Sequence, residues 1–221
     1  MSPVVKQLRT PSTNAPAVSL SSPVVRVQAR FGNTWAAWGS GFFIGQWPSS
    51  IITARHVVAL PQGVTPSDLR VEAFVNGSWS CFEASAIAFP SGGIAAPDLA
   101  IVRIQGTCAT SLEMATMDAP CRVQVWGYPL TSGRPSGKPS IVDCRAKPAD
   151  KFIELARAGQ PGMSGGPVVA ISEAGQPLAA VGVYLGTSPK GPKAHILNDN
   201  ALFESKDAAL NVIAAPSGTN S

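Results

Sequence analysis

The sequence predicts an all-β protein built from two six-stranded antiparallel β-barrels, with one helix near the C-terminus. Turn-forming residues are abundant, with 21 Gly and 20 Pro among 221 residues. Between them lie many short runs rich in Val, Ile, Phe, Trp and Ala, a pattern that favours short strands joined by turns over long helices. Because each half of the chain holds about six such runs, we expect two barrels.

The candidate strands form two sets, separated by a loop at residues 105–120. The first set covers residues 24–31, 34–45, 50–58, 70–75, 79–89 and 99–104. The second set covers residues 121–129, 140–146, 151–156, 166–172, 178–186 and 194–197. Residues 199–213 carry apolar side chains at helical spacing and are the predicted helix. We therefore place the first barrel in residues 23–108 and the second barrel, with its helix, in residues 109–213.

Both ends of the chain are predicted to lie outside the barrels. Residues 1–22 are rich in Ser, Thr, Pro and Ala and predict a flexible basic arm, and residues 214–221 predict a disordered tail. Residues 1–67 carry five basic and no acidic side chains. This charge is sparse and has no aromatic residues among it in the arm, which favours a solvated arm over a nucleic-acid tether. We expect no nucleic-acid partner.

Composition excludes several classes of protein. The longest apolar runs are far shorter than the roughly 20 residues that a helix needs to span a bilayer. The hydrophobic fraction of 45% and the net charge of +4 exclude a disordered polymer. No signal peptide pattern follows the first residue, which predicts a cytoplasmic location and leaves secretion as the alternative. The oligomeric state is left open.

The cysteine and histidine content gives no sign of a cofactor or metal. Four cysteines allow three disulfide pairings, but without a signal peptide we favour buried free thiols, at Cys81, Cys108, Cys121 and Cys144. Only two histidines occur, far apart, and no cysteines cluster, so no metal-ligand spacing is present. The phosphate-binding pattern of a strand, a Gly-rich loop and a Lys is also missing.

One segment predicts nucleophilic chemistry. Four glycines at 159–166 surround Ser164, directly before an apolar strand. Glycine-rich turns can aim backbone N–H groups at one point, where they stabilise a developing oxyanion. A serine hydroxyl needs a base, and His56 follows an apolar strand at the point where strand gives way to loop. The base in turn needs an acceptor, and Asp98, at the start of an apolar strand, fits better than Asp68 or Glu72, which lie among polar residues.

The chain contains, in this order, the segments GSGFFIG, IITARHVV, DLAIVRI, GYP, GQPGMSGGPVV and VGVYLG. This order resembles the chymotrypsin-like serine proteases, and most of all their short HtrA-like bacterial and viral members. The resemblance covers about residues 24–213. It implies that His56 is the general base, Asp98 the residue that orients it and Ser164 the nucleophile. It also implies a chymotrypsin-like fold, a polypeptide substrate, an acyl-enzyme intermediate, and an oxyanion hole formed by the N–H groups of Gly162 and Ser164.

The same resemblance places the pocket for the residue before the scissile bond, the P1 residue. Its floor is Ala158, and its wall is formed by Val183, Tyr184, Leu185 and Gly186. Because Ala158 carries no charge, we expect a small or medium apolar P1 residue and no preference for Lys or Arg. In the alternative hypothesis, His195 or Arg157 reaches the pocket and selects an acidic or amide side chain.

Two departures from the family pattern are informative. Met163 occupies the position where digestive and clotting members carry an Asp that pairs with a newly cut amino terminus. Methionine cannot form that ion pair, so activation by amino-terminal trimming is not expected. Arg55 directly precedes the base, and a cation there would disfavour the imidazolium form of His56, so we expect the Arg55 side chain to point away.

Two other functions remain as hypotheses beside a serine endopeptidase. The first is a pseudoprotease that keeps the barrels as a binding module, although such proteins usually lack one of the three catalytic residues. The second is a viral protease that processes a polyprotein, and no fused capsid or polymerase segment accompanies this chain.

Overall fold

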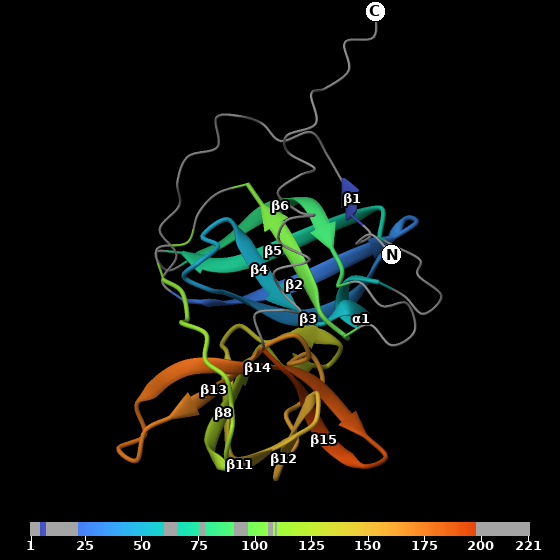
Figure 1. The fold of residues 1–221 in the computed structure, drawn as a ribbon. Helices are drawn as coiled ribbons and strands as arrows, with labels where there is room; N and C mark the ends of the chain where they lie inside the picture. Colours follow the sequence, from blue (N-terminus) through green and yellow to red (C-terminus); the bar gives the residue numbers. More distant parts are fainter. Residues whose placement is uncertain are drawn as a thin grey trace, which may run out of the picture.

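The computed structural model describes residues 5–7, 22–59, 66–75, 78–90, 97–105, 108 and 110–197. It contains two β-barrels, one above the other in Figure 1, with the first half of the chain in the upper barrel and the second half in the lower. The prediction of two six-stranded antiparallel barrels is confirmed. The predicted helix at 199–213 and the tail lie outside the described residues.

The first barrel is closed because the two strands at the ends of its six-strand order pair with each other. The sheet order is β6-β5-β2-β3-β4-β7, with β6 also hydrogen-bonded to β7, and a short β1 adds to β6. The strands are β1 (Val5–Gln7), β2 (Val24–Phe31), β3 (Thr34–Phe43), β4 (Ser50–Thr53), β5 (Asp68–Val75), β6 (Ser78–Ala88) and β7 (Ala100–Ile104). β1 and Ser22 are the described parts of the predicted arm.

The second barrel is closed in the order β11-β12-β15-β14-β13-β8. Its strands are β8 (Cys121–Gly127), β11 (Ser140–Ala149), β12 (Phe152–Leu155), β13 (Pro167–Ile171), β14 (Pro177–Ser188) and β15 (Gly191–Ile196). A small hairpin of β9 (Leu130–Thr131) and β10 (Arg134–Pro135) lies between β8 and β11. This hairpin was missed from the sequence because its strands are only two residues long.

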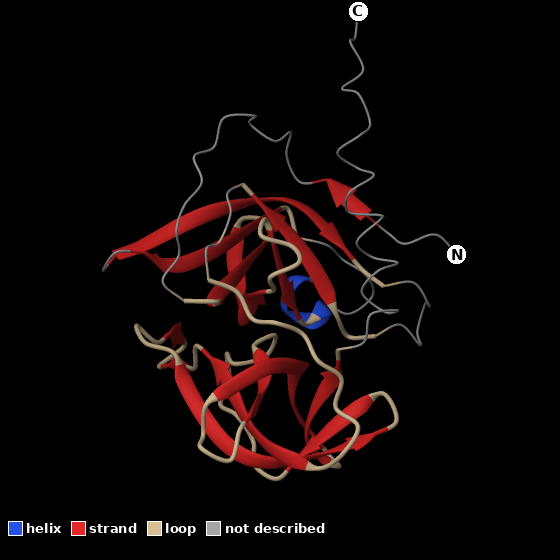
Figure 2. Cartoon of the chain, turned by 60° about the vertical axis from the view of Figure 1, so that its left-hand side comes forward, coloured by secondary structure: helices blue, strands red, loops and turns tan. Residues whose placement is uncertain are grey.

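The predicted run at residues 50–58 is a strand followed by a helical turn, not a strand that ends in a loop. β4 ends at Thr53, and α1 (Arg55–Val58) begins with a bond from the Val57 N–H to the Ala54 carbonyl. The turn buries Val57 and Val58 and leaves His56 exposed. Figure 2 shows α1 near the boundary between the barrels, which brings His56 there.

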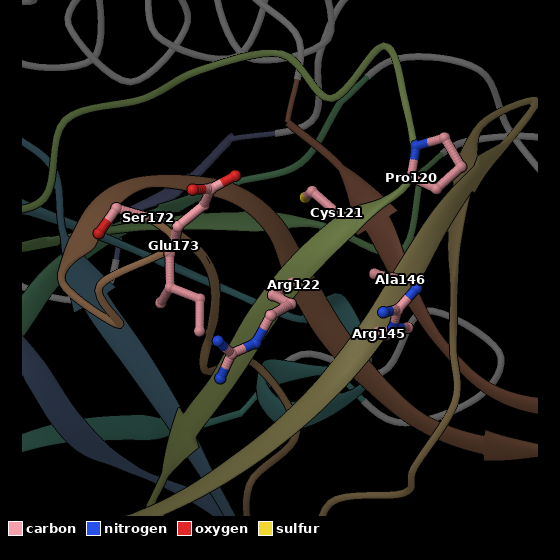
Figure 3. A pocket seen from close by; sticks show the side chains of 8 residues that line it. Pro120, Cys121, Arg122, Arg145, Ala146, Ser172 and Glu173 are labelled. Carbon is pink, nitrogen blue, oxygen red and sulfur yellow. The ribbon is translucent and has the colours of Figure 1, made fainter.

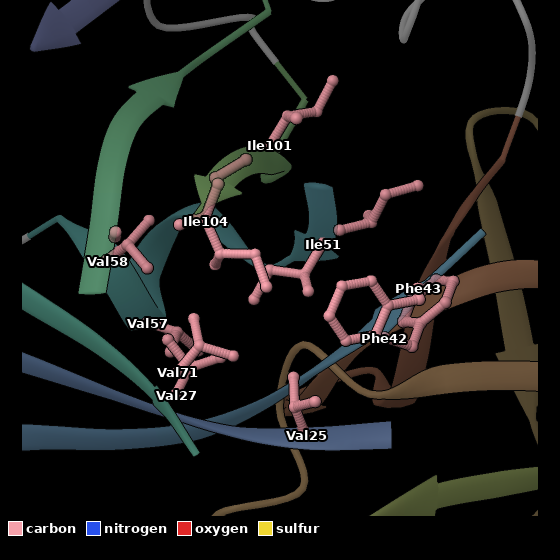
Figure 4. Packing of buried hydrophobic residues seen from close by; sticks show 14 of the residues in the cluster. Val25, Val27, Phe42, Phe43, Ile51, Val57, Val58, Val71, Ile101 and Ile104 are labelled. Atoms are coloured by element: carbon pink, nitrogen blue, oxygen red, sulfur yellow. The ribbon is translucent and has the colours of Figure 1, made fainter. Parts of the chain in front are cut away.

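The core of the first barrel is formed by side chains that alternate along its strands. β5 alternates between buried and more exposed positions along its whole length. In Figure 4, Val25, Phe43, Ile51 and Ile104 come from four different strands, and the strand register places all four on the same face of the sheet. Ala180, Val183 and Leu197 of the second half belong to the same cluster, so the two barrels share apolar packing.

In the described part of the chain, no helix has the length and apolar character that crossing a membrane requires.

Phe42→Ala is expected to lower the free energy of unfolding by about 3–5 kcal/mol, because it removes a fully buried ring and leaves a cavity. Leu178→Ala is the control, since Leu178 is 61% exposed, and should change the value by no more than about 0.5 kcal/mol. Urea denaturation followed by fluorescence measures both. Equal losses in the two variants would contradict the assignment of the core.

Candidate active site

Strand pairing in the first barrel brings His56 and Asp98 together. Thr53 at the end of β4 is paired with Ala100 at the start of β7. His56 follows Thr53 in α1, and Asp98 precedes Ala100, so the two residues lie at the same edge of the sheet. His56 Nδ1 lies 2.8 Å from Asp98 Oδ2, and the His56 backbone N–H donates to Oδ1 at 3.0 Å.

This double contact fixes the orientation of the imidazole. A carboxylate beside Nδ1 favours the tautomer with the proton on Nδ1, so that Nε2 keeps its lone pair. Burial raises the pKa of Asp98, but the hydrogen bonds and charge of His56 outweigh this effect and hold the pKa below its usual value. Asp98 therefore stays ionised at neutral pH and places a negative charge beside the His56 ring.

The two rival carboxylates are engaged elsewhere in the barrel. Asp68 accepts the backbone N–H of Leu69, and Glu72 forms an ion pair with Arg26 at 3.3 Å. Both belong to β5, which pairs with β2 and β6 and not with β4 or β7.

Ser164 lies in a tight glycine turn that leads into β13. The Gly165 N–H donates to the Tyr184 carbonyl at 2.7 Å, and the Gly166 N–H donates to the Met163 carbonyl at 3.0 Å. Gly165 has φ of +86°, and a Cβ there would lie 2.1 Å from the Ser40 carbonyl oxygen. A side chain at position 165 would be strained by the positive φ and would clash with the Ser40 carbonyl, so only glycine fits there.

The nucleophile turn and α1 meet at β3. The Ser40 N–H donates to the Ser164 carbonyl at 2.7 Å. At Gly39, an added Cβ would lie 2.5 Å from a Val57 methyl carbon and 2.9 Å from the Ser164 carbonyl oxygen. Val57 and Ser164 therefore flank the same glycine. The structure gives no hydrogen bond between His56 and Ser164, and such bonds are often long before substrate binds.

Two backbone donors beside Ser164 are free to bind an oxyanion. The Leu130 N–H donates to the Pro161 carbonyl at 2.7 Å, and the next N–H in the same trans peptide, that of Gly162, points the opposite way. Within the described part of the chain, neither the Gly162 nor the Ser164 N–H has an acceptor. Sequence reasoning predicted these two donors but missed Leu130, which orients one of them through its backbone and carries no side-chain signal.

Of the residues predicted to form the P1 pocket, Tyr184 and Gly186 lie next to the glycine turn that carries Ser164. Ala158, the predicted floor, is exposed. Tyr184 is 1% exposed, and its hydroxyl accepts the Gly159 N–H at 2.9 Å. At Gly186 an added Cβ would lie 3.5 Å from Ser164 Oγ. The strand from Tyr184 to Gly186 thus lies beside Ser164. The Tyr184 ring fills the base of the loop that carries Ser164.

His195 lies on the other face of that sheet. It is paired with Val183 and Phe152, whereas Tyr184 is paired with Ala194. Because side chains alternate along a strand, His195 and Tyr184 point in opposite directions. The His195 ring contacts the edge of Phe152, with centroids 5.5 Å apart, and Nδ1 lies 2.9 Å from the Ile196 carbonyl. Burial lowers the pKa of His195.

Arg55 directs its guanidinium to Phe89, with 5.0 Å between its central carbon and the ring centroid. Arg157, the other residue of the pocket alternative, is exposed.

The four cysteines are free thiols, as predicted. Their burial differs from the prediction, because Cys108 is buried, Cys121 and Cys144 are half-buried, and Cys81 is exposed. Partial desolvation of the thiol raises the pKa of Cys81, Cys121 and Cys144, which keeps these thiols protonated at neutral pH. No group of three potential metal ligands occurs in the described ranges.

A separate pocket of about 340 Å³ lies on the second barrel and contains none of the predicted catalytic residues (Figure 3). Its lining includes Cys121, Arg122, Arg145 and Glu173.

The chain belongs to the trypsin-like peptidase family. The family model for the trypsin-like peptidase domain matches residues 39–183, which is more than half of the chain and includes His56, Asp98 and Ser164. The family and the two-barrel fold support serine peptidase activity on a polypeptide substrate. A search of curated protein sequences gives no match.

Solved structures of serine proteases share the fold. A thermostable serine protease, AL20, from an extremophilic microorganism has a TM-score of 0.67 and 14% identity, over 85% of this chain and 97% of that chain. The protease Anisep from Arthrobacter nicotinovorans has a TM-score of 0.67 and 13% identity, over 93% and 99%. A Glu endopeptidase has a TM-score of 0.65 and 17% identity, over 93% and 96%.

Asp98→Asn is expected to destabilise the protein at pH 7 and to matter less at low pH. The folded-state pKa of Asp98 is depressed, so its stabilising contribution is present above the unfolded pKa of about 3.9 and is lost as the pH falls through the folded value. Urea denaturation of wild type and variant at pH 7, 5 and 3 measures the difference in free energy of unfolding. Asp118→Asn, at an exposed carboxylate, is the control. A difference that is constant or grows toward pH 3 would contradict this assignment.

Proposed function

We propose that this protein is a serine endopeptidase that hydrolyses peptide bonds through a Ser164–His56–Asp98 triad and an acyl-enzyme intermediate. The observation that carries the proposal is the convergence of three elements at the boundary of the barrels. They are an imidazole held by a carboxylate at 2.8 Å, a serine on a glycine turn, and two unpaired backbone N–H groups beside it. Each has a role in acyl transfer.

In the proposed reaction, His56 Nε2 takes the hydroxyl proton of Ser164 as Oγ attacks the scissile carbonyl. The carbonyl oxygen becomes negatively charged and is stabilised by the N–H groups of Gly162 and Ser164. The imidazolium returns the proton to the leaving amine, which leaves an ester on Ser164. Water, activated by the same His56, then hydrolyses that ester. Asp98 orients the ring and stabilises its charge throughout.

Neither alternative has a specific observation in its favour. A pseudoprotease would be expected to lack a triad residue or an oxyanion donor, and this chain carries a candidate for each of them. A polyprotein-processing role would require a selective substrate groove, and no feature of the described residues points to one.

For the P1 residue, we propose a small or medium apolar side chain. The support is the position of Tyr184, whose ring would lie 2.9 Å from a Cβ at Gly159 and therefore occupies space under the nucleophile loop. Ala158 and the wall residues carry no charge that would attract Lys or Arg. The alternative in which His195 selects an acidic side chain has no support in the strand register, which turns His195 away from Tyr184.

Ser164→Ala is expected to abolish peptidase activity, with a fall of at least about 10³-fold in kcat, because no other group can form the acyl-enzyme. Labelling by a fluorophosphonate reports the activated serine without a known substrate. Wild type should label, and Ser164→Ala and His56→Ala should not. Unchanged peptidase activity in Ser164→Ala would rule out the mechanism.

Tyr184→Val is expected to shift the P1 preference toward larger apolar residues, by about 10-fold in the ratio of kcat/KM values for Leu over Ala substrates. The pocket deepens because the ring is removed. Tyr184→Phe keeps the ring and loses only the contact to the Gly159 N–H, so its preference should stay near wild type. A library of peptides that differ at P1 measures the ratios. His195→Ala should leave them unchanged, and a loss of acidic P1 cleavage in that variant would favour the alternative.

A further inference from the structure

We propose that Arg26, in the first barrel, is a positioning residue that holds the β9–β10 hairpin of the second barrel and thereby keeps the Gly162 N–H directed at the substrate carbonyl. This inference rests on the proposed function. It concerns a residue that lies outside the triad and the P1 pocket.

Arg26 is a largely buried cation at the boundary between the barrels. It lies on β2 and is 9% exposed. Nη1 contacts Glu72 at 3.3 Å, on the adjacent strand β5. The central guanidinium carbon lies 3.3 Å from the centroid of the Trp79 ring, which places the flat face of the cation on an aromatic side chain of the same barrel. Glu72 and Trp79 thus fix the guanidinium from the side of the first barrel.

On its other side, Arg26 contacts both ends of residues 128–136, the segment that contains the β9–β10 hairpin. Nη2 donates to the Ser136 carbonyl at 2.5 Å, just after β10. The guanidinium also lies 5.4 Å from the centroid of the Tyr128 ring, just before β9, and Tyr128 is 1% exposed. Tyr128 packs edge-on against Trp79, with 5.3 Å between their centroids. The Ser136 N–H donates to the Pro129 carbonyl at 2.7 Å and closes the segment.

This segment is in direct contact with the oxyanion donor. The Leu130 N–H donates to the Pro161 carbonyl at 2.7 Å. At Gly162, an added Cβ would lie 2.7 Å from the Tyr128 carbonyl oxygen and 2.8 Å from the Leu130 nitrogen. If the hairpin withdrew, the peptide between Pro161 and Gly162 would lose the partner that fixes its orientation. Rotation of that peptide would turn the Gly162 N–H away from the reacting carbonyl.

The glycine turn that carries Ser164, residues 159–166, has no charged side chain that could fix the peptide between Pro161 and Gly162. Met163 is fully buried, and its side chain offers only its sulfur, which accepts the Gln160 N–H at 3.2 Å. Its backbone N–H donates to the Gln160 carbonyl at 3.1 Å, a bond that rotation of the peptide between Pro161 and Gly162 does not break. Ser40 fixes the Gly162 carbonyl from the other side through a hydrogen bond of 2.9 Å, but this bond leaves the preceding peptide free to rotate. The link from Arg26 through the hairpin is therefore what fixes the peptide that carries the Gly162 N–H.

The test is Arg26→Gln, which removes the charge and the planar contact with Trp79. Because an oxyanion donor acts mainly in the transition state, we expect kcat per active site to fall 10- to 100-fold, with KM changed less than threefold. Active-site titration counts the folded, reactive molecules, so a loss caused only by unfolding is removed from kcat. Arg30→Gln is the matched control, since Arg30 lies on the same strand and its guanidinium donates to the Gly32 carbonyl. It should keep kcat within twofold of wild type.

A second measurement does not depend on activity. Amide hydrogen exchange at Leu130 should speed up at least 10-fold in Arg26→Gln relative to Arg30→Gln, while the amides of β13 keep their protection. If Arg26→Gln does not fold, Glu72→Gln, which weakens the hold on the guanidinium, is measured in the same way with a smaller expected effect in the same direction.

Unchanged Leu130 exchange, or unchanged kcat per titrated site in an active enzyme, would overturn the inference. The outcomes also separate the two proposals. A wild type without Ser164-dependent activity but with Arg26-dependent protection of Leu130 would overturn the proposed function and leave the structural role of Arg26 supported.

Discussion

The hydrogen bonds of Ser40 join the two barrels at the nucleophile turn. Ser40 lies on β3 of the first barrel and is fully buried. Its N–H donates to the Ser164 carbonyl, its hydroxyl donates to the Gly162 carbonyl, and the same hydroxyl oxygen accepts the Tyr128 N–H. The hydroxyl of Thr53, at the end of β4, donates to the Ser40 carbonyl. One residue thus connects the nucleophile loop, the segment before the hairpin and the strand that leads to the base.

The position of the loop that carries Ser164 is sensitive to the loss of any of these hydrogen bonds, because the groups that form them are buried. A buried backbone N–H or carbonyl that loses its partner keeps the full cost of its removal from water, about 1–3 kcal/mol for each group. The glycines at the boundary add a steric constraint, since side chains at Gly39 or Gly165 would meet backbone or side-chain atoms closer than 3.0 Å. The position of Ser164 relative to α1 is therefore fixed by packing and hydrogen bonds from both barrels, and not by the nucleophile loop alone.

Most of the fold could be predicted because its signals are local. Each predicted run from residue 24 to residue 197 contains a strand of the barrels, since short apolar runs closed by turn residues have few other stable arrangements. The errors have physical reasons. At residues 54–58 burial of Val57 and Val58 favoured a helical turn, and at Leu130–Thr131 and Arg134–Pro135 the strands were too short to stand out. Tyr184 was predicted as part of the pocket wall, but its hydrogen bond to Gly159 depends on a contact across 25 residues.

The sequence by itself determined the chemical types at the site: two histidines to choose from, one serine in a glycine turn, and an aspartate at the start of an apolar strand. Periodicity and turn chemistry are properties of neighbouring residues, so they can be read without a structure. The tertiary structure alone decided how those groups meet. The His56–Asp98 contact spans 42 residues, the Ser40–Gly162 bond spans 122, and the link from Arg26 to Ser136 spans 110. Contacts at such separations arise only when both barrels close and pack together, because no local preference specifies which distant group will lie opposite.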